Sequence, residues 1–108
     1  MSLSDGRPII AIGGALDLST APPIRRMLSS VIDEIGPDHP SLVLDLRRLE
    51  FMDTSGLALL IHARRSARER GGTVVLVGVV PRVRRVLAKT NLLSLFTVYT
   101  ELTEATGS

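Results

Sequence analysis

Short apolar runs alternate along this chain with longer segments whose apolar residues recur at helical spacing, and this alternation limits the available folds. The short runs lie at 7–13, 40–46, 73–77 and 95–99 and have the length and composition typical of strands. Residues 42–44 are continuously apolar, which is typical of a strand covered on both faces. The order β-α-β-α-β-α-β therefore predicts an α/β fold, with a largely parallel sheet and helices packed against it.

Three segments between these runs carry the periodicity and end signals of helices. The first follows the polar N-cap candidates at 17–20, has two prolines in its first turn and ends at Gly36 and Pro37. The second runs from residues 54–55 to about Arg70, and the third opens at Pro81. The apolar stripe of the first helix is Ile24, Leu28, Val31 and Ile35, and that of the second is Gly56, Leu59, Leu60, Ala63 and Ala67.

Length and composition narrow the class of protein. A chain of 108 residues can bury one hydrophobic core, so we expect a single domain over residues 1–108. The absence of cysteine excludes disulfides, thiolate nucleophiles and cysteine-ligated metals. No apolar run approaches the roughly 18–20 residues that span a bilayer, and the N-terminus does not resemble a signal peptide. We therefore expect a cytoplasmic protein without direct membrane contact.

The charge pattern gives no support for nucleic-acid binding. The formal net charge is only +2, which leaves little field to hold a polyanion. Arginines cluster at 64–70 and 82–85, and we interpret both clusters as solvated helix faces. The chain has one tyrosine, two phenylalanines and no tryptophan, so it lacks an aromatic platform for stacking bases.

Most catalytic and cofactor motifs are absent from the sequence. The two histidines, His39 and His62, lie in different elements without the spacing of metal ligands, so no metal site is expected. Ser55 lacks a G-x-S-x-G context, and His62 lies seven residues along the same helix, roughly 10 Å away and out of reach. The glycine pairs at 13–14 and 71–72 belong to no phosphate-binding motif.

Two kinds of protein that use an aspartate carboxylate are compared with the sequence: aspartic proteases and proteins phosphorylated on aspartate. Residues 53–56, Asp-Thr-Ser-Gly, differ from the D-[ST]-G signature of aspartic proteases by one extra residue, and those proteases need an all-β fold. Asp45 or Asp53 could accept a phosphoryl group, but the usual acidic pair is missing and the single lysine, Lys89, lies in an arginine-rich helix. An enzyme that uses Asp53 as acceptor or nucleophile remains an open alternative.

The strand–turn–helix junction at residues 53–56 places hydroxyl side chains at the start of a helix. Asp53, Thr54 and Ser55 are ordinary N-cap residues, worth about 1 kcal/mol, and Gly56 permits close packing. On local physics alone, a purely structural role for this junction is a sufficient explanation.

Three ordered matches resemble the STAS domain, specifically the anti-sigma-factor antagonists. Residues 49–57, Leu-Glu-Phe-Met-Asp-Thr-Ser-Gly-Leu, follow the strand Leu-Val-Leu-Asp-Leu at 42–46 and resemble the family signature D-S-[ST]-G-L. Residues 14–21, Gly-Ala-Leu-Asp-Leu-Ser-Thr-Ala, resemble the family's G-x-L-D-x-x-T-A. The third match is a series of three features in the family's order: the glycine pair at 71–72 before an apolar strand, the proline at 81 that opens a helix, and residues 90–93, which resemble the family's S-G-L segment. Together they cover a core of about 7–99 and imply a mixed, mostly parallel sheet with helices mainly on one side.

The resemblance implies a regulatory binding protein rather than an enzyme. In the family, the residue after the signature aspartate is phosphorylated by a partner serine/threonine protein kinase that is also the anti-sigma factor. The unphosphorylated antagonist binds that kinase and releases the sigma factor. A phosphatase resets the modified protein, and the resemblance implies one of the PP2C type. The acceptor implied here is Thr54, with Ser55 as the fallback, and the implied partner-binding residues are Asp17, Asp53, Thr54, Ser55, Gly56 and Leu57. No cofactor is implied, because the kinase supplies ATP.

The chain departs from the family pattern at a few positions, and one alternative role stays open. Thr54 replaces the commoner serine, Asn91 stands where glycine is usual, and the segment before Ile9 leaves room only for a reduced edge strand. The alternative is a STAS regulatory module of a transporter, a lipid-trafficking system or a stress-signalling scaffold. The sequence does not indicate an oligomeric state.

Overall fold

The computed structural model describes residues 2–4, 7–36 and 41–101, and two β-sheets organise this part of the chain. The strands are β1 (Ser2–Ser4), β2 (Arg7–Ala11), β3 (Gly14–Leu16), β4 (Ser41–Asp45), β5 (Leu49–Met52), β6 (Thr73–Val77) and β7 (Thr97–Tyr99). The helices are α1 (Ala21–Ile32), α2 (Thr54–Glu69), α3 (Pro81–Lys89) and the short 3₁₀ helix η1 (Leu93–Leu95).

The main sheet has five strands in the order β1-β2-β4-β6-β7. Its edge strand β1 runs antiparallel to β2, and the other three pairings are parallel. A second, two-stranded sheet pairs β3 with β5 in parallel. These pairings confirm the predicted α/β class and the mixed, mostly parallel sheet.

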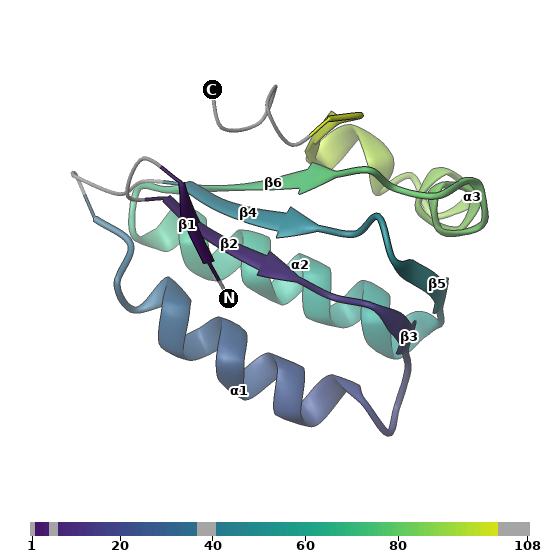
Figure 1. The fold of residues 1–108 in the computed structure, drawn as a ribbon, viewed down its shortest axis with the longest axis horizontal. Helices are drawn as coiled ribbons and strands as arrows, with labels where there is room; N and C mark the ends of the chain where they lie inside the picture. The colour runs from purple at the N-terminus through teal and green to yellow at the C-terminus, as the bar shows by residue number, and fades with distance from the viewer. Residues whose placement is uncertain (1, 5–6, 37–40, 102–108) are drawn as a thin grey trace.

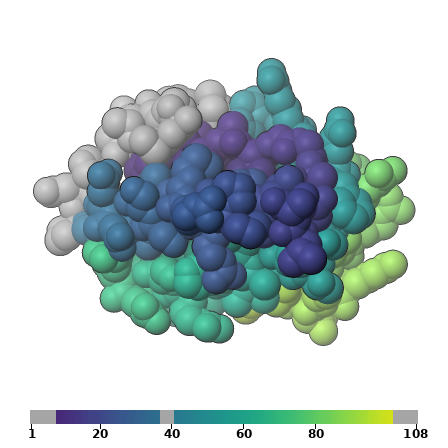
Figure 2. Space-filling model, turned by 90° about the horizontal axis from the view of Figure 1, so that it is seen from below, coloured from purple at the N-terminus to yellow at the C-terminus, as the bar shows by residue number. Residues whose placement is uncertain are grey.

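Helices α1 and α2 lie side by side on one face of the main sheet, and α3 packs against β5 at one end of the molecule (Figure 1). Figure 2, seen from below, shows α1 in blue lying across this face. The main core lies between the two layers and includes Leu42, Leu44 and Leu76 from the sheet and Leu28, Leu59 and Leu60 from the helices. This arrangement confirms that the helices pack mainly on one side.

Strand β4 is buried on both faces, as its continuous apolar run predicts. Leu42 and Leu44 belong to the main core, whereas Val43 joins a second cluster on the opposite face with Ile9 and Val77. Each of the three β4 side chains is fully buried.

The structure corrects several predicted boundaries. No strand is predicted between residue 46 and the second helix, but Leu49–Met52 form strand β5. The first helix ends at Ile32, although Ile35 is buried as the pattern predicts. Leu95 belongs to η1 and not to the last strand. The C-terminal tail and His39 lie outside the described residues.

Asn91 adopts a positive φ of 60° just beyond the third helix. The position therefore needs a left-handed backbone, which asparagine tolerates better than most residues. Replacement of the family's usual glycine by asparagine is consistent with this geometry. No helix in the described ranges is long and apolar enough to cross a membrane.

Candidate functional site

The two turns that carry the predicted site leave adjacent parallel strands at the same edge. Leu16 at the end of β3 is paired with Met52 at the end of β5. The Asp53 amide donates to the Leu16 carbonyl at 3.2 Å, which extends the ladder by one bond. The turn that begins at Asp17 and the helix start at Thr54 are therefore neighbours in space, although Asp53 comes 36 positions after Asp17 in the sequence.

Asp53 is the N-cap of α2. Its backbone is extended, and its Oδ1 accepts hydrogen bonds from the amides of Ser55 at 2.8 Å and Gly56 at 3.3 Å. These bonds satisfy two of the amides that a helix start leaves without intrahelical partners. Thr54 is the first residue of the helix and is exposed, whereas Ser55 is half-buried. The hydroxyl at 54 is thus the more accessible of the two candidate acceptors.

Gly56 and Leu57 are buried and hold the helix start against the two short strands. A Cβ at position 56 would lie 2.9 Å from the Leu16 carbonyl oxygen and 3.0 Å from the Leu16 Cγ, and would also meet the Met52 side chain. Only glycine allows this close approach of helix and strand. Gly56 and Leu57 therefore position the site and do not offer a surface for direct contact.

The turn after β3 is organised by Asp17. Its Oδ1 accepts from the Ser19 amide at 2.9 Å, the Ser19 hydroxyl at 2.8 Å and the Thr20 amide at 3.1 Å. The Thr20 hydroxyl donates to the Ala15 carbonyl at 2.9 Å and accepts from the Asp17 amide, also at 2.9 Å. Thr20 occupies the N-cap position of α1 but makes no side-chain cap bond, because its hydroxyl is turned back into the preceding turn. This corrects the expectation that residues 17–20 cap the first helix through their side chains.

The two segments that form this site carry acidic side chains and no basic ones. The Ser19 hydroxyl, and then the Thr20 amide, hold the pKa of the Asp17 carboxyl below its usual value. Segments 14–20 and 49–58 contain Asp17, Glu50 and Asp53 but no lysine, arginine or histidine. The described residues contain no group of three metal-ligating side chains, so the acidic groups do not form a cation site there.

Two exposed apolar side chains at this site were missed by the sequence analysis. Leu18 is 78% exposed and Phe51 is 45% exposed. The signal in the sequence is the apolar Leu18 inside the otherwise polar turn 17–20, although single exposed leucines are common on protein surfaces.

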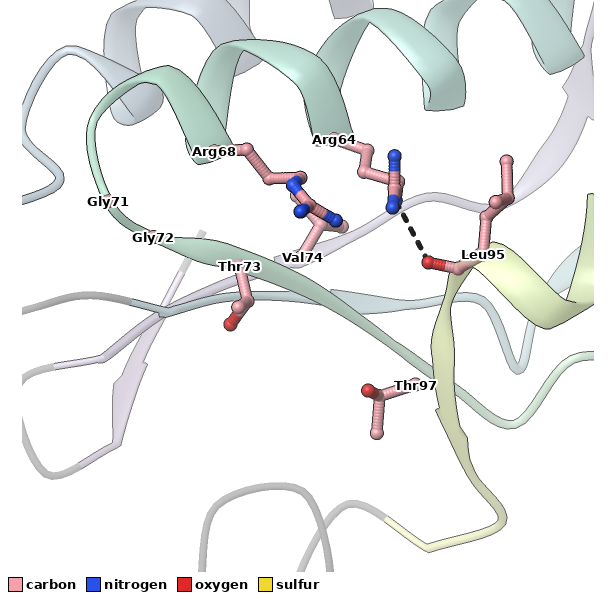
Figure 3. Close-up of a pocket in the computed structure, with 8 residues that line it drawn as sticks. All are labelled: Arg64, Arg68, Gly71, Gly72, Thr73, Val74, Leu95 and Thr97. Atoms are coloured by element: carbon pink, nitrogen blue, oxygen red, sulfur yellow. Dashed lines mark hydrogen bonds between the residues drawn. The ribbon is translucent and has the colours of Figure 1, made fainter.

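A cavity of about 420 Å³ lies elsewhere, beside the C-terminal half of α2 (Figure 3). Arg64 and Arg68 project into it from the helix, and the Arg64 Nε donates to the Leu95 carbonyl at 2.9 Å. That bond leaves Arg64 half-buried, which corrects the prediction of a fully solvated arginine face. Arg64 is ten residues along α2 from Thr54, roughly 15 Å at 1.5 Å per residue, so this cavity is separate from the site.

Asp45, the other candidate phosphoryl acceptor, forms an ion pair with Arg47. Arg47 donates from Nε to Oδ1 at 2.9 Å and from Nη2 to Oδ2 at 2.7 Å. These bonds also hold the pKa of the Asp45 carboxyl below its usual value. Both carboxylate oxygens are occupied, which disfavours Asp45 as a nucleophile.

Replacing Asp53 by alanine should lower the free energy of unfolding by about 1 kcal/mol, because the amides of Ser55 and Gly56 lose their acceptor. Urea denaturation measures the change. Glu50→Ala is a matched control, since it removes an exposed carboxylate from β5 without touching the cap. Equal stabilities of the two variants would show that the cap contributes nothing.

Comparison with known proteins gives a match to the STAS domain model over residues 2–105. The anti-sigma F factor antagonist of Paenibacillus polymyxa is 30% identical over 91 residues, covering 84% of this chain and 76% of that protein. The intermembrane phospholipid transport system binding protein MlaB of Escherichia coli is 34% identical over 74 residues, covering 68% of this chain and 70% of that protein.

Solved structures agree with these sequence matches. An anti-sigma factor antagonist from Mycobacterium paratuberculosis superposes with a TM-score of 0.85 at 26% identity, covering 99% of this chain and 91% of that one. The antagonist SpoIIAA in its unphosphorylated form gives 0.80 at 25% identity, covering 97% and 89%. The phosphorylated form of SpoIIAA gives 0.74 at 24%, covering 97% and 92%, and supports the fold alone. The STAS domain of a SulP transporter from Vibrio cholerae gives 0.71 at 25% identity, covering 96% and 80%.

Proposed function

The chain belongs to the STAS domain family, and from that premise we propose that it is an anti-sigma-factor antagonist whose binding is controlled by phosphorylation of Thr54. In this proposal the unphosphorylated protein binds an anti-sigma factor that is also a serine/threonine kinase, and a sigma factor is released. Phosphorylation of Thr54 ends the complex, and a phosphatase of the PP2C type restores the binding form. In this proposal the kinase binds ATP and transfers the phosphate, so the phosphorylation requires no catalysis by this chain.

The observation that carries this proposal is the exposed Thr54 hydroxyl at the first position of a capped helix. A phosphate at that position adds about −1.5 to −2 charges next to the positive end of the dipole of a 16-residue helix. The fold therefore tolerates the modification. SpoIIAA, which is similar to this chain, is known in unphosphorylated and phosphorylated forms.

The same modification is unfavourable for a partner that packs on this surface. The phosphate adds bulk and charge beside Asp53, and close contact would require much of that charge to be desolvated. The capped helix start and the Asp17 turn stay in place, so the change is confined to the contact surface. In this way a local modification controls binding without unfolding the site.

A second candidate role is a STAS module in transport or lipid trafficking, or in a stress-signalling scaffold. The similarity to MlaB and to the SulP transporter domain favours it specifically. The two roles predict different partners: an ATP-binding anti-sigma kinase for the first, and membrane proteins or a scaffold for the second.

Incubation with ATP, Mg²⁺ and purified candidate anti-sigma kinases from the same genome should add one phosphate, located on Thr54. Intact-mass measurement and site mapping check this result. Ser55→Ala should still be phosphorylated, and Thr54→Ala should not. Phosphate on Ser55 of the unaltered protein would contradict the assigned acceptor, and the absence of both phosphate and complex would favour the transport-module role.

A further inference from the structure

Leu18 has the largest exposed fraction among the large hydrophobic residues of 8–36 and 41–101. It is 78% exposed, compared with 45% for Phe51, 42% for Leu95 and 37% for Met27. Exposure of this extent leaves more than three quarters of the residue in water, at a cost that burial against another molecule would reverse. Leu18 is therefore the least covered of these four residues and the best placed for an apolar contact.

The turn that presents Leu18 is held on both sides by hydrogen bonds. Asp17 before it accepts from the amides of Ser19 and Thr20, and the Thr20 hydroxyl after it donates to the Ala15 carbonyl. The backbone around Leu18 is consequently ordered before any partner arrives. An anchor on an ordered turn loses less conformational entropy on binding than one on a flexible loop.

Leu18 also lies beside the proposed phosphorylation site. It follows Leu16 by two residues and Thr54 follows Met52 by two, and Leu16 and Met52 are a register pair. The Asp53 amide bonds directly to the Leu16 carbonyl. The turn that carries Leu18 and the helix start that carries Thr54 therefore leave the paired strands side by side, so one partner surface can reach both. Phe51, paired with Ala15 on the same two strands, adds a second exposed apolar group to this end of the molecule.

We propose that Leu18 is a hydrophobic anchor of the complex and inserts into an apolar pocket of the anti-sigma factor next to the Thr54 contact. The inference rests on the proposed function, because it names the chemistry by which that same partner is held. Within it Asp17 has a positioning role, since one of its carboxylate oxygens is occupied in forming the turn. Leu18 supplies the apolar contact, and Thr54 supplies the switch.

The test compares Leu18→Ser with Leu95→Ser by isothermal titration calorimetry against the anti-sigma kinase that binds the unaltered protein. Leu95 is a matched control, because it is also an exposed leucine but lies beside Arg64, toward the other end of α2 (Figure 3). We expect Leu18→Ser to weaken binding about tenfold or more, and Leu95→Ser to leave it unchanged. The loss should persist at high ionic strength, because an apolar contact is not screened by salt. Leu18→Met should restore most of the affinity.

The outcomes separate failure of this inference from failure of the proposed function. If the unaltered protein binds a kinase and Leu18→Ser binds equally well, Leu18 is not an anchor. Equal losses for the serine variants at positions 18 and 95 would also overturn the inference, because the effect would not be specific to the site. If the unaltered protein binds none of the candidate kinases, the proposed function fails and this inference fails with it. The melting temperatures of the Leu18 variants should match that of the unaltered protein, since Leu18 is 78% exposed. The melting temperature of Leu95→Ser shows whether the control variant is folded under the conditions of the titration.

Discussion

Replacing Thr54 by glutamate should weaken binding to the anti-sigma factor by about a hundredfold, whereas Thr54→Ala should bind like the unaltered protein. The glutamate places a charge at the exposed first position of α2, where it is compatible with the helix but must be desolvated in a contact. A hundredfold loss corresponds to about 2.7 kcal/mol. Calorimetry with the purified kinase measures both affinities in the absence of ATP.

The difference between these variants should also appear when ATP is present. The unaltered protein should lose its complex with time as Thr54 is modified, and Thr54→Ala should keep it. Thr54→Ser retains a hydroxyl and is the conservative control, since it should be released like the unaltered protein. Equal affinity of the alanine and glutamate variants would mean that Thr54 is only a helix-start residue and that the switch lies elsewhere.

Gly56→Ala should be among the most destabilising single-methyl additions in the chain, with a loss of about 2 kcal/mol in the free energy of unfolding. Alanine in a helix is intrinsically favoured over glycine by about 1 kcal/mol, so packing must outweigh that gain. The added Cβ would lie 2.9 Å from the Leu16 carbonyl oxygen, a backbone atom that a rotamer change cannot move. The helix start must therefore shift away from β3 and β5.

Gly36→Ala is the matched control for this prediction, because a Cβ there meets nothing within 4 Å. Its stability should stay within about 0.5 kcal/mol of the unaltered protein. Urea unfolding monitored by circular dichroism gives both values. If Gly56→Ala is as stable as Gly36→Ala, the close approach of α2 to β3 does not constrain residue 56.

The main sheet and its helix layer could be predicted from the sequence because their signals are long and regular. Strand β4 is a run of buried apolar residues, and α2 carries an apolar stripe over its 16 residues. The start of α2 could also be placed, since Asp53, Thr54 and Gly56 combine cap chemistry with a close-packing glycine. These features rest on local rules, which a single sequence expresses directly.

The second sheet could not be predicted from periodicity, because β3 and β5 have only three and four residues. A strand of that length shows too little alternation to differ from a polar connector. The pairing of Leu16 with Met52 is a tertiary contact, and it alone makes the Asp17 and Asp53 turns neighbours. The exposure of Leu18 likewise depends on the turn geometry set by Asp17, which no local pattern of apolar residues encodes.

The proposed contact residues lie on the two-stranded β3–β5 sheet or directly after its strands, outside the main sheet, and this placement has an evolutionary consequence. Four residues in this part of the molecule are exposed: Leu18, Glu50, Phe51 and Thr54. The buried Leu16, Met52 and Gly56 hold the β3–β5 sheet against α2. Exposed positions can change at little cost in stability, so duplicated copies of such a gene could diverge there while keeping one scaffold. Under the proposed function, several such proteins could then operate in one cell, each binding its own partner through the few exposed side chains at this end of the molecule.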